Sequence, residues 1–246
     1  MVGLLTGSQE VASTSRSGAT RTRAGDLLMR FHREPLQPVA CASVRECHLK
    51  TPLRPLGKNG PVTGDALKLL VRAIRASQAP PGVTTRIVAI DGAGGAGKSS
   101  LAKWLASSLR ASIIHTDDFA SWENPVNWWP ELIELALKPL AAGQPARYQP
   151  TKWADETKDP IVIRPGGTVV LEGVTASRLA FRPYLAYSIW IEADRRLRLQ
   201  RGIDRDGAEA RAQWERWMDE EERYILAERP AEHADIVLRS DLDLWV

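Results

Sequence analysis

Cysteine is almost absent from this chain of 246 residues, which contains only Cys41 and Cys47. Their spacing fits no standard zinc-binding pattern, so we expect no metal site at these thiols. Residues 61–246 contain no cysteine at all, and this absence excludes thiol chemistry from the larger part of the chain. It is compatible with a reducing cytoplasm, which is where we expect the protein.

Long apolar runs are missing too. No apolar stretch approaches the roughly 18 residues of a membrane-spanning helix, so we expect no membrane partner. The first residues also lack the apolar core of about 7 to 15 residues that marks a secretory signal.

A large excess of one charge is absent from most of the chain, although the formal net charge is +3. Residues 1–60 contain nine Lys and Arg against four Asp and Glu, a net charge of +5. Residues 61–246 contain 24 against 26 and are therefore slightly acidic, at −2. The basic character belongs to the N-terminal segment, so we expect no nucleic-acid binding by the rest of the chain.

Residues 1–60 show no sustained helical or strand period, and the first 25 are rich in Ser, Thr, Gly and Arg. This composition is typical of disorder and also resembles that of an organellar transit peptide. A third interpretation places the natural start near Pro61–Gly64, where the pattern changes, and treats the preceding residues as an over-extended reading frame. We therefore assign the folded domain to residues 61–246.

Strands and helices are predicted to alternate from residue 65 onward. Short apolar runs predict strands, whereas apolar residues at intervals of three and four predict helices. This alternation is typical of an α/β fold with a doubly wound parallel sheet of about five strands. The expected strands are residues 87–90, 112–115, 168–171, 187–192 and 235–238, with a small strand at 161–164. The expected helices are residues 65–77, 101–109, 130–141, 195–206 and 208–227, and residues 146–159 are expected to be irregular.

The central motif is RIVAIDGAGGAGKSSL, residues 86–101. A buried-strand pattern precedes a glycine-rich turn that satisfies GxxxxGK[ST], and helical spacing follows it. Glycines let backbone N–H groups turn inward around a polyphosphate, and the positive end of the following helix faces the same anion. Lys98 is expected to reach the β- and γ-phosphates and Ser99 to bind Mg²⁺. The predicted nucleotide-binding residues are Gly92, Gly94, Gly95, Ala96, Gly97, Lys98, Ser99 and Ser100.

Acidic residues follow two predicted strands at their carboxyl ends, where open α/β sheets bind ligands. Asp117 and Asp118 come after residues 112–115, and Glu172 ends the strand 168–171. Phosphoryl transfer needs a carboxylate that orients or deprotonates the acceptor hydroxyl and another that holds Mg²⁺. We predict the first role for Asp117 and the second for Glu172, while a helix cap or a turn is the structural alternative for each.

Arginines recur at helical spacing after the strand expected at residues 187–192. Arg198, Arg201 and Arg205 fall at i, i+3 and i+7, on one face of the predicted helix. Like charges gathered in this way repel one another unless they have a partner. That partner is either a triphosphate, whose oxygens suit the guanidinium fork, or Asp204 and Asp206 together with the Glu-rich helix that follows.

Tryptophan is frequent, with nine residues against three Phe and four Tyr. Four of them lie on predicted helix or strand faces and are interpreted as core: Trp104, Trp190, Trp214 and Trp217. Four others lie in loops where an acceptor pocket is expected, and both stacking on a substrate and packing are open for them. These are Trp122, Trp128, Trp129 and Trp153.

Taken in order, five segments resemble the uridine kinase and phosphoribulokinase family of P-loop small-molecule kinases. They are GAGGAGKSS, DDF after the second strand, VVLEGV, RLQRGIDRD and the final HADIVLRS. The resemblance covers residues 86–240. It implies a P-loop NTPase fold with a helical lid, and phosphorylation of a hydroxyl on a small molecule by ATP with Mg²⁺.

The resemblance also implies roles for individual residues. Asp117 matches the family's catalytic acid and Glu172 its acid near the metal, while the three arginines match its lid. The catalytic set is therefore Lys98, Asp117, Arg201 and Arg205, the metal ligands are Ser99 and Glu172, and Arg198 joins the nucleotide-binding residues. The residues predicted to contact the acceptor are Asp118, Phe119, Trp122, Tyr148 and Trp153.

Three positions depart from the family pattern. Ala120 replaces its tyrosine, and Gly202 replaces the second of its paired lid arginines. Gln149 replaces the aspartate that helps to hold the ribose in nucleoside kinases. Asp155 and the loop tryptophans are candidates for the replacement contacts.

We therefore predict an α/β P-loop kinase, monomeric or homo-oligomeric, that transfers the γ-phosphoryl group of ATP to a small, nucleoside-like acceptor. The alternative is a P-loop ATPase that acts as a nucleotide-dependent switch or regulatory module. The aromatic loops and the position of Asp117 favour the kinase.

Overall fold

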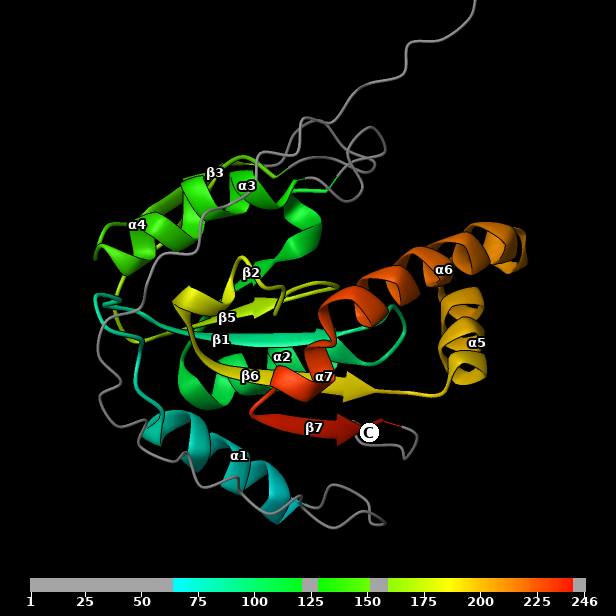
Figure 1. Cartoon of the computed structure of the whole chain (residues 1–246), viewed down its shortest axis with the longest axis horizontal. Coiled ribbons are helices and arrows are strands. Elements are labelled where there is room, and N and C mark those ends of the chain that lie inside the picture. Colours follow the sequence, from blue (N-terminus) through cyan, green and yellow to red (C-terminus); the bar gives the residue numbers. More distant parts are fainter. Residues whose placement is uncertain (1–63, 121–127, 151–158, 241–246) are drawn as a thin grey trace, which may run out of the picture. The chain divides into compact units, whose positions relative to one another are not determined.

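Five parallel strands form a sheet in the order β2-β5-β1-β6-β7 (Figure 1). The structure is a computed structural model that describes residues 64–120, 128–150 and 159–240, all of which belong to the unit Lys50–Val246. The strands are β1 (Arg86–Gly92), β2 (Ser112–His115), β5 (Thr168–Glu172), β6 (Leu185–Glu192) and β7 (Ile236–Arg239). The longer helices are α1 (Gly64–Ala76), α2 (Lys98–Leu109), α5 (Arg195–Asp206) and α6 (Arg211–Glu228), and a short helix, α7 (Pro230–His233), precedes β7.

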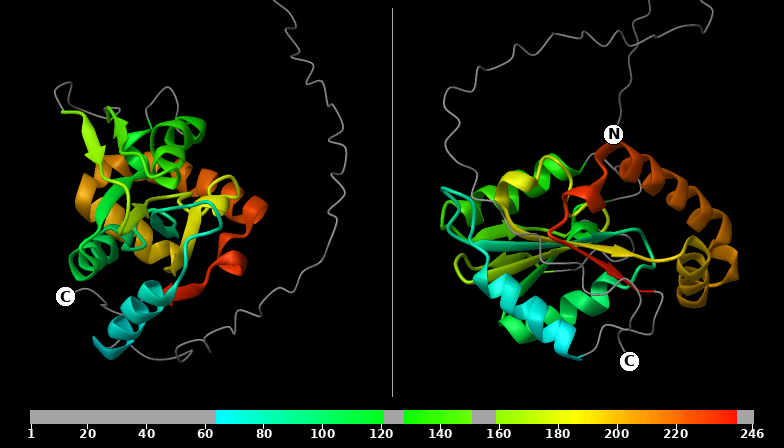
Figure 2. Two further views of the ribbon diagram at one scale, coloured as in Figure 1. Left: turned by 90° about the vertical axis from the view of Figure 1, so that its left-hand side faces the viewer. Right: turned by 60° about the horizontal axis from the view of Figure 1, so that its bottom comes forward.

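Helices cover both faces of this sheet (Figure 2). On one face, α1 and α2 pack over Val88 and Ile90 of β1. On the other face, the helical residues 129–141 pack over Ile87 and Ala89 of the same strand. Successive residues of β1 thus enter two different cores, which is why the strand reads as a continuous apolar run. The predicted doubly wound parallel sheet is confirmed.

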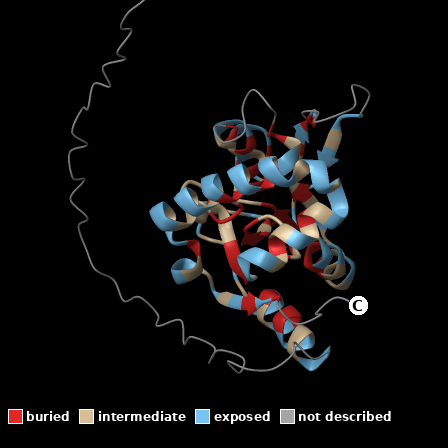
Figure 3. Ribbon diagram, turned by 90° about the vertical axis from the view of Figure 1, so that its right-hand side faces the viewer, coloured by how far each residue is buried: buried red, intermediate tan, exposed pale blue. Residues whose placement is uncertain are grey.

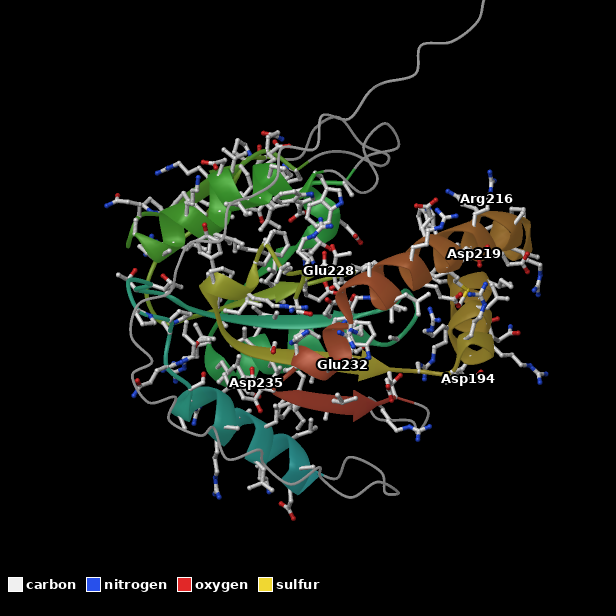
Figure 4. All side chains as sticks on the ribbon, viewed as in Figure 1. Asp194, Arg216, Asp219, Glu228, Glu232 and Asp235 are labelled. Carbon is white, nitrogen blue, oxygen red and sulfur yellow. The ribbon has the colours of Figure 1, made fainter. Side chains whose placement is uncertain are left out.

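Most predicted elements begin and end within two or three residues of the observed ones. The strand Ser112–His115 and the helix Arg195–Asp206 coincide with their predicted bounds. Asp194 caps α5 as predicted, because its carboxylate accepts hydrogen bonds from the amides of Arg196 and Leu197 at 2.8 and 3.2 Å (Figure 4). Within the described ranges, no helix combines the length and the apolarity that crossing a membrane requires.

The helix predicted over residues 130–141 is interrupted. It consists of α3 (Trp129–Leu132), a π-helical turn (Ile133–Leu137) and α4 (Lys138–Ala141). Pro139 provides the physical reason, because proline has no N–H to donate and its ring crowds the carbonyl four residues earlier. A π-turn just before the proline accommodates both effects.

The prediction of an irregular segment over residues 146–159 is wrong at its start. Ala146–Tyr148 form β3, which pairs antiparallel with β4 (Ile161–Ile163) in a separate two-stranded sheet. Ala146 and Tyr148 are buried while Arg147 between them is exposed, which is the alternation of a half-buried strand. Three residues are too few for this period to be recognised in the sequence.

The buried residues gather on the strands and on the inner faces of the helices that flank them (Figure 3). In α1 these are Leu70, Val71 and Ile74. Through this inner face α1 packs against the sheet.

Replacing Ile74 with Ala should lower the free energy of unfolding by about 2 to 5 kcal/mol, because Ile74 is completely buried and the cavity is only partly refilled. Leu69→Ala is the matched control on the same helix, since Leu69 is 48% exposed and should change stability by no more than about 0.5 kcal/mol. Denaturant unfolding of both variants measures this. Equal losses would contradict the packing of α1 on the sheet.

Candidate active site

The predicted phosphate loop connects β1 to α2. Its glycines adopt backbone conformations that other residues avoid, with φ of +75° at Gly95 and +94° at Gly97. Gly97 is the N-cap residue of α2 and has no side chain that could accept from the amides of the first turn. These amides and the positive end of the helix dipole therefore form an anion-binding position, as the motif predicts.

Lys98 and Ser99 begin α2 and point to two different partners. The Lys98 side chain is buried, and its Nζ donates to the carbonyl of Ala93 at 3.0 Å, across the base of the loop. The Ser99 hydroxyl donates to Oε1 of Glu172 at 2.9 Å. The two predicted metal ligands are thus in direct contact.

Glu172 ends β5, where the register pairs it with Ile90 of β1 and with His115 of β2. Its Oε2 lies 2.6 Å from Nδ1 of His115. Burial alone would raise the pKa of Glu172. The hydrogen bond with His115, the charge of Lys98 and the hydrogen bond from Ser99 outweigh burial and hold this pKa below its usual value.

His115 was not predicted to belong to the site. The hydrogen bond with Glu172 raises the pKa of its imidazole, burial opposes this, and the charges of Glu172, Asp118 and Asp117 add to it. The residue directly precedes the acidic pair at the end of a predicted strand, and that position is the signal that sequence reasoning passed over.

The donor set of Ser99 and Glu172 fits Mg²⁺. Both are hard oxygen ligands, and Mg²⁺ usually takes one or two protein ligands while phosphates and water complete its shell. Among the described residues no group of three or more His, Cys, Asp or Glu could hold a metal ion alone. Any Mg²⁺ held here would complete its shell with ligands other than these two side chains, such as water and phosphate oxygens.

Asp117 and Asp118 lie in a 3₁₀ turn (Thr116–Asp118) that follows β2. Asp117 is exposed at the surface of the site, yet the protein atoms around its carboxyl group exclude enough water to raise its pKa. The charge of Lys98 opposes this effect, and the charge of Glu172 adds to it. The Asp118 carboxylate accepts a hydrogen bond from the Tyr148 hydroxyl at 3.2 Å. The structure thus brings Asp117 within electrostatic reach of Lys98 and Glu172.

Gly173 allows this approach. A Cβ at this residue would lie 1.8 Å from Oγ1 of Thr116, and its φ is +144°. Only glycine lets the end of β5 pass so close to the turn that carries Asp117.

Aromatic side chains form a cluster beside Asp118. The Phe119 ring, predicted to contact the acceptor, is 2% exposed and lies 4.6 Å from the Tyr148 ring centroid and 6.5 Å from that of Trp128. Trp128 also contacts Phe181, at 6.4 Å. Of the two interpretations for Trp128 and Trp129, their contacts are those of packing, because both belong to or adjoin the buried core.

Arg178 contacts this aromatic cluster and was also not predicted from the sequence. Its guanidinium carbon is 5.3 Å from the ring centroid of Trp129 and 5.9 Å from that of Phe181. Burial lowers the pKa of Arg178, and its Nη1 has no hydrogen-bond partner in the described part of the chain. Trp122, Trp153 and Asp155, predicted for the same side of the site, lie outside the described residues, as do Cys41 and Cys47.

The three predicted lid arginines differ in their contacts. Arg198 donates to the carbonyl of Gly94 and to Glu221 of α6, and Arg201 donates to the carbonyl of Gly95 and to Ser240. Glu221 belongs to the Glu-rich helix, so the contacts of Arg198 agree with the second of the two interpretations given for this face, in which acidic side chains pair with the arginines. A role of these arginines at a triphosphate remains a prediction.

Arg205 is bonded to Asp206 through Nε at 2.7 Å and Nη2 at 2.8 Å. This bonding raises the pKa of Arg205, burial opposes it, and the charge of Asp117 contributes in the same direction as Asp206.

Trp214 fills the position that Gly202 leaves open. A Cβ at Gly202 would lie 2.4 Å from the Trp214 indole, whose Nε1 donates to Asp206. The arginine of the family pattern could not fit beside this indole. A cavity of about 380 Å³ adjoins it, lined by Asp206, Glu209, Ala210, Gln213, Trp214 and Trp217, and none of the residues predicted for the site lines it.

Asp91, the last acidic residue before the loop, was not recognised either. It is completely buried, and its carboxylate accepts hydrogen bonds from the amides of Gly92, Thr175 and Ser177 and from the hydroxyls of Ser177 and Tyr224, at 2.6 to 2.9 Å. The segment after β5 and the helix α6 are thus both attached to the end of β1.

The comparisons with known proteins concern the fold. Among solved structures, a "possible uridine kinase" from Bacillus stearothermophilus is similar to this chain with a TM-score of 0.52 and 20% sequence identity, covering 71% of this chain and 97% of that chain. This chain has the P-loop kinase fold. The fold-level resemblance expected from the five sequence segments is confirmed.

A sugar kinase from Janibacter sp. HTCC2649 is similar to this chain with a lower TM-score of 0.40 and 19% sequence identity, covering 63% of this chain and 85% of that chain. No protein-family model and no curated protein matched the sequence.

Replacing Glu172 with Gln should lower the pKa of His115, because the bond to the Glu172 carboxylate is the largest cause of its raised value. NMR titration of the imidazole, assigned with a His115→Gln variant, measures this. In the wild type we expect a pKa above 6.5. The contribution of the pair to stability is then complete below pH 6.5 and lost as the pH rises through the folded-state pKa. A His115 pKa that is the same in both proteins would contradict the pairing.

Proposed function

We propose that this protein is an ATP-dependent kinase that transfers the γ-phosphoryl group to a hydroxyl of a small molecule, with a nucleoside-like acceptor favoured. The observation that carries the proposal is the arrangement of Asp117, Lys98 and Glu172 at one edge of the sheet, beside a loop whose amides form an anion-binding position. In a P-loop protein that only hydrolyses ATP, such a carboxylate would orient water instead, and the dependence of ADP release on an acceptor separates the two functions.

The phosphate side of the site consists of the loop and the start of α2. The loop backbone from Gly92 to Gly97 and the amides of Lys98, Ser99 and Ser100 would bind the phosphates, and the charge of Lys98 would neutralise them. Ser99 and Glu172 would hold Mg²⁺, which supplies charge neutralisation at the transferring phosphoryl group when bound. To act as metal ligands, these two side chains would exchange the hydrogen bond between them for bonds to the cation.

On the acceptor side, Asp117 would orient the hydroxyl and accept its proton. Its raised pKa supports this role, because a general base works best when its pKa approaches the working pH. Asp118, fixed by the Tyr148 hydroxyl, would bind the acceptor beside it. Phe119 would support both acids from the core, and Trp122 and Trp153 remain predicted acceptor contacts.

The arginines of α5 would act from the opposite side. The charge of Asp117 is one of the causes that raise the pKa of Arg205, so we assign Arg205 to the charge that develops during transfer. Arg201 and Arg198 contact the loop backbone, so we assign Arg201 to catalysis and Arg198 to nucleotide binding.

The experiment that tests the function is the release of ADP from Mg²⁺–ATP with and without a panel of nucleosides, sugars and vitamins. A kinase should release ADP faster with the correct acceptor, and mass spectrometry should detect the phosphorylated product. Hydrolysis that no acceptor stimulates would contradict the kinase and favour the nucleotide-dependent switch.

Replacing Asp117 with Asn should lower kcat by roughly 10² to 10⁴ and leave the affinity for ATP unchanged, because the amide keeps the shape of the carboxylate but cannot accept the proton. Steady-state kinetics and calorimetric ATP titration measure the two effects. Asp118→Asn is the comparison variant and should raise the acceptor KM more than it lowers kcat. Normal turnover by Asp117→Asn would remove Asp117 from the mechanism.

A further inference from the structure

Cationic side chains donate to three successive carbonyls of the phosphate loop. Lys98 donates to the carbonyl of Ala93 at 3.0 Å, Arg198 to that of Gly94 at 3.4 Å, and Arg201 to that of Gly95 at 3.3 Å. In a planar trans peptide, the N–H points away from the carbonyl of the same peptide unit. A cation that fixes the Gly94 carbonyl therefore turns the Gly95 N–H to the opposite side of the loop.

Glu221 of α6 holds the same glycine from the other end. Its Oε1 accepts the N–H of Gly94 at 2.9 Å, and its Oε2 accepts Nη1 of Arg198 at 3.2 Å. The N–H and the carbonyl of Gly94 are thus both bonded, one by the carboxylate and one by its guanidinium partner. The two peptide units on either side of Gly94 have little freedom to rotate.

The Arg198–Glu221 ion pair is buried. The two side chains are 7% and 11% exposed. A buried ion pair contributes little net stability unless its geometry is good and further hydrogen bonds satisfy it. Here those further bonds go to the two polar groups of Gly94 and to the carbonyl of Ala193, so the pair fixes the loop backbone.

The absence of side chains at Gly94 and Gly95 leaves room for α5 and α6 to approach the loop backbone. A Cβ at Gly94 would lie 2.9 Å from Glu221 Oε1 and 2.9 Å from the Trp214 ring, and a Cβ at Gly95 would lie 2.6 Å from the carbonyl oxygen of Arg198. The two glycines are therefore required as much by the contact with α5 and α6 as by the turn itself.

A direct contact between Arg198 and a phosphate is the competing interpretation. Its Nε donates to Ala193 and its Nη1 is shared between Gly94 and Glu221. Ser99 and Ser100, at the anion-binding end of α2, are exposed, whereas Arg198 is buried. These contacts favour a role through the loop backbone.

We infer that Arg198 and Glu221 are positioning residues that set the direction of the phosphate-loop amides before the nucleotide arrives. The inference rests on the proposed function, because it assumes that the loop binds ATP. Since the pair acts on the backbone amides, it should strengthen the binding of any nucleotide whose phosphates reach those amides, whether or not a γ-phosphate is present.

Calorimetric titration of Arg198→Met, Glu221→Gln and the double variant with ATP and with ADP tests this. We expect each single variant to lower the affinity for ATP about tenfold and the affinity for ADP by the same factor. The double variant should bind each nucleotide with the same affinity as the single variant that binds it less tightly, because the two residues act as one unit. Arg198→Lys should recover part of the loss, since an ammonium can still donate to the Gly94 carbonyl.

The matched controls are Arg195→Met and Glu222→Gln, which break an exposed ion pair between the same two helices. They should leave both affinities unchanged. Thermal unfolding of every variant separates loss of the fold from loss of binding, and Arg198→Lys keeps the test decisive if the methionine variant does not fold.

Weaker binding of ATP with unchanged binding of ADP would overturn the inference in favour of a direct contact with the γ-phosphate. Unchanged binding of both nucleotides in Arg198→Lys and Glu221→Gln would overturn it as well. A wild-type protein that binds neither nucleotide would instead contradict the proposed function itself.

Discussion

The Asp91 carboxylate has no contact with solvent, so its oxygens have to be satisfied by the protein. Its donors come from the first residue of the phosphate loop, from the segment that follows Glu172, and from Tyr224 of α6. These three elements carry or adjoin the residues of the candidate site. One buried group therefore fixes the distance between the loop, the strand that carries the predicted metal ligand, and the helix whose Glu221 contacts the loop.

The order of the strands determines what lies beside this point. β1, β5 and β2 are neighbours and parallel, so the loop, Glu172 and the turn with Asp117 follow one another along the same edge of the sheet. On the other side of the loop, Arg198 of α5 and Glu221 of α6 bond to its backbone. The chain thus surrounds one anion-binding loop with both acidic and basic side chains.

Features that depend on short stretches of sequence were predictable. The apolar run Ile87–Ile90, the glycines of the loop and the acids at the ends of two strands each carry a local pattern, and the fold follows from their alternation. Apart from Gly92, the partners of Asp91 lie more than 80 residues away along the chain, and no local pattern reveals them. Helical spacing likewise placed Arg198 on a face of α5 but could not tell which neighbour that face meets. Gly202 was read as a missing arginine, and only the packing of Trp214 explains it.

The central claim is that the phosphate loop, Glu172 and Asp117 form one site for phosphoryl transfer. A crystal structure with Mg²⁺ and a non-hydrolysable ATP analogue tests it most directly. The account predicts phosphates on the amides of Gly95, Gly97 and Lys98, Mg²⁺ at Ser99 and Glu172, and the γ-phosphate facing Asp117. A nucleotide bound elsewhere, or phosphates in the loop with the γ-phosphate directed away from Asp117, would contradict it.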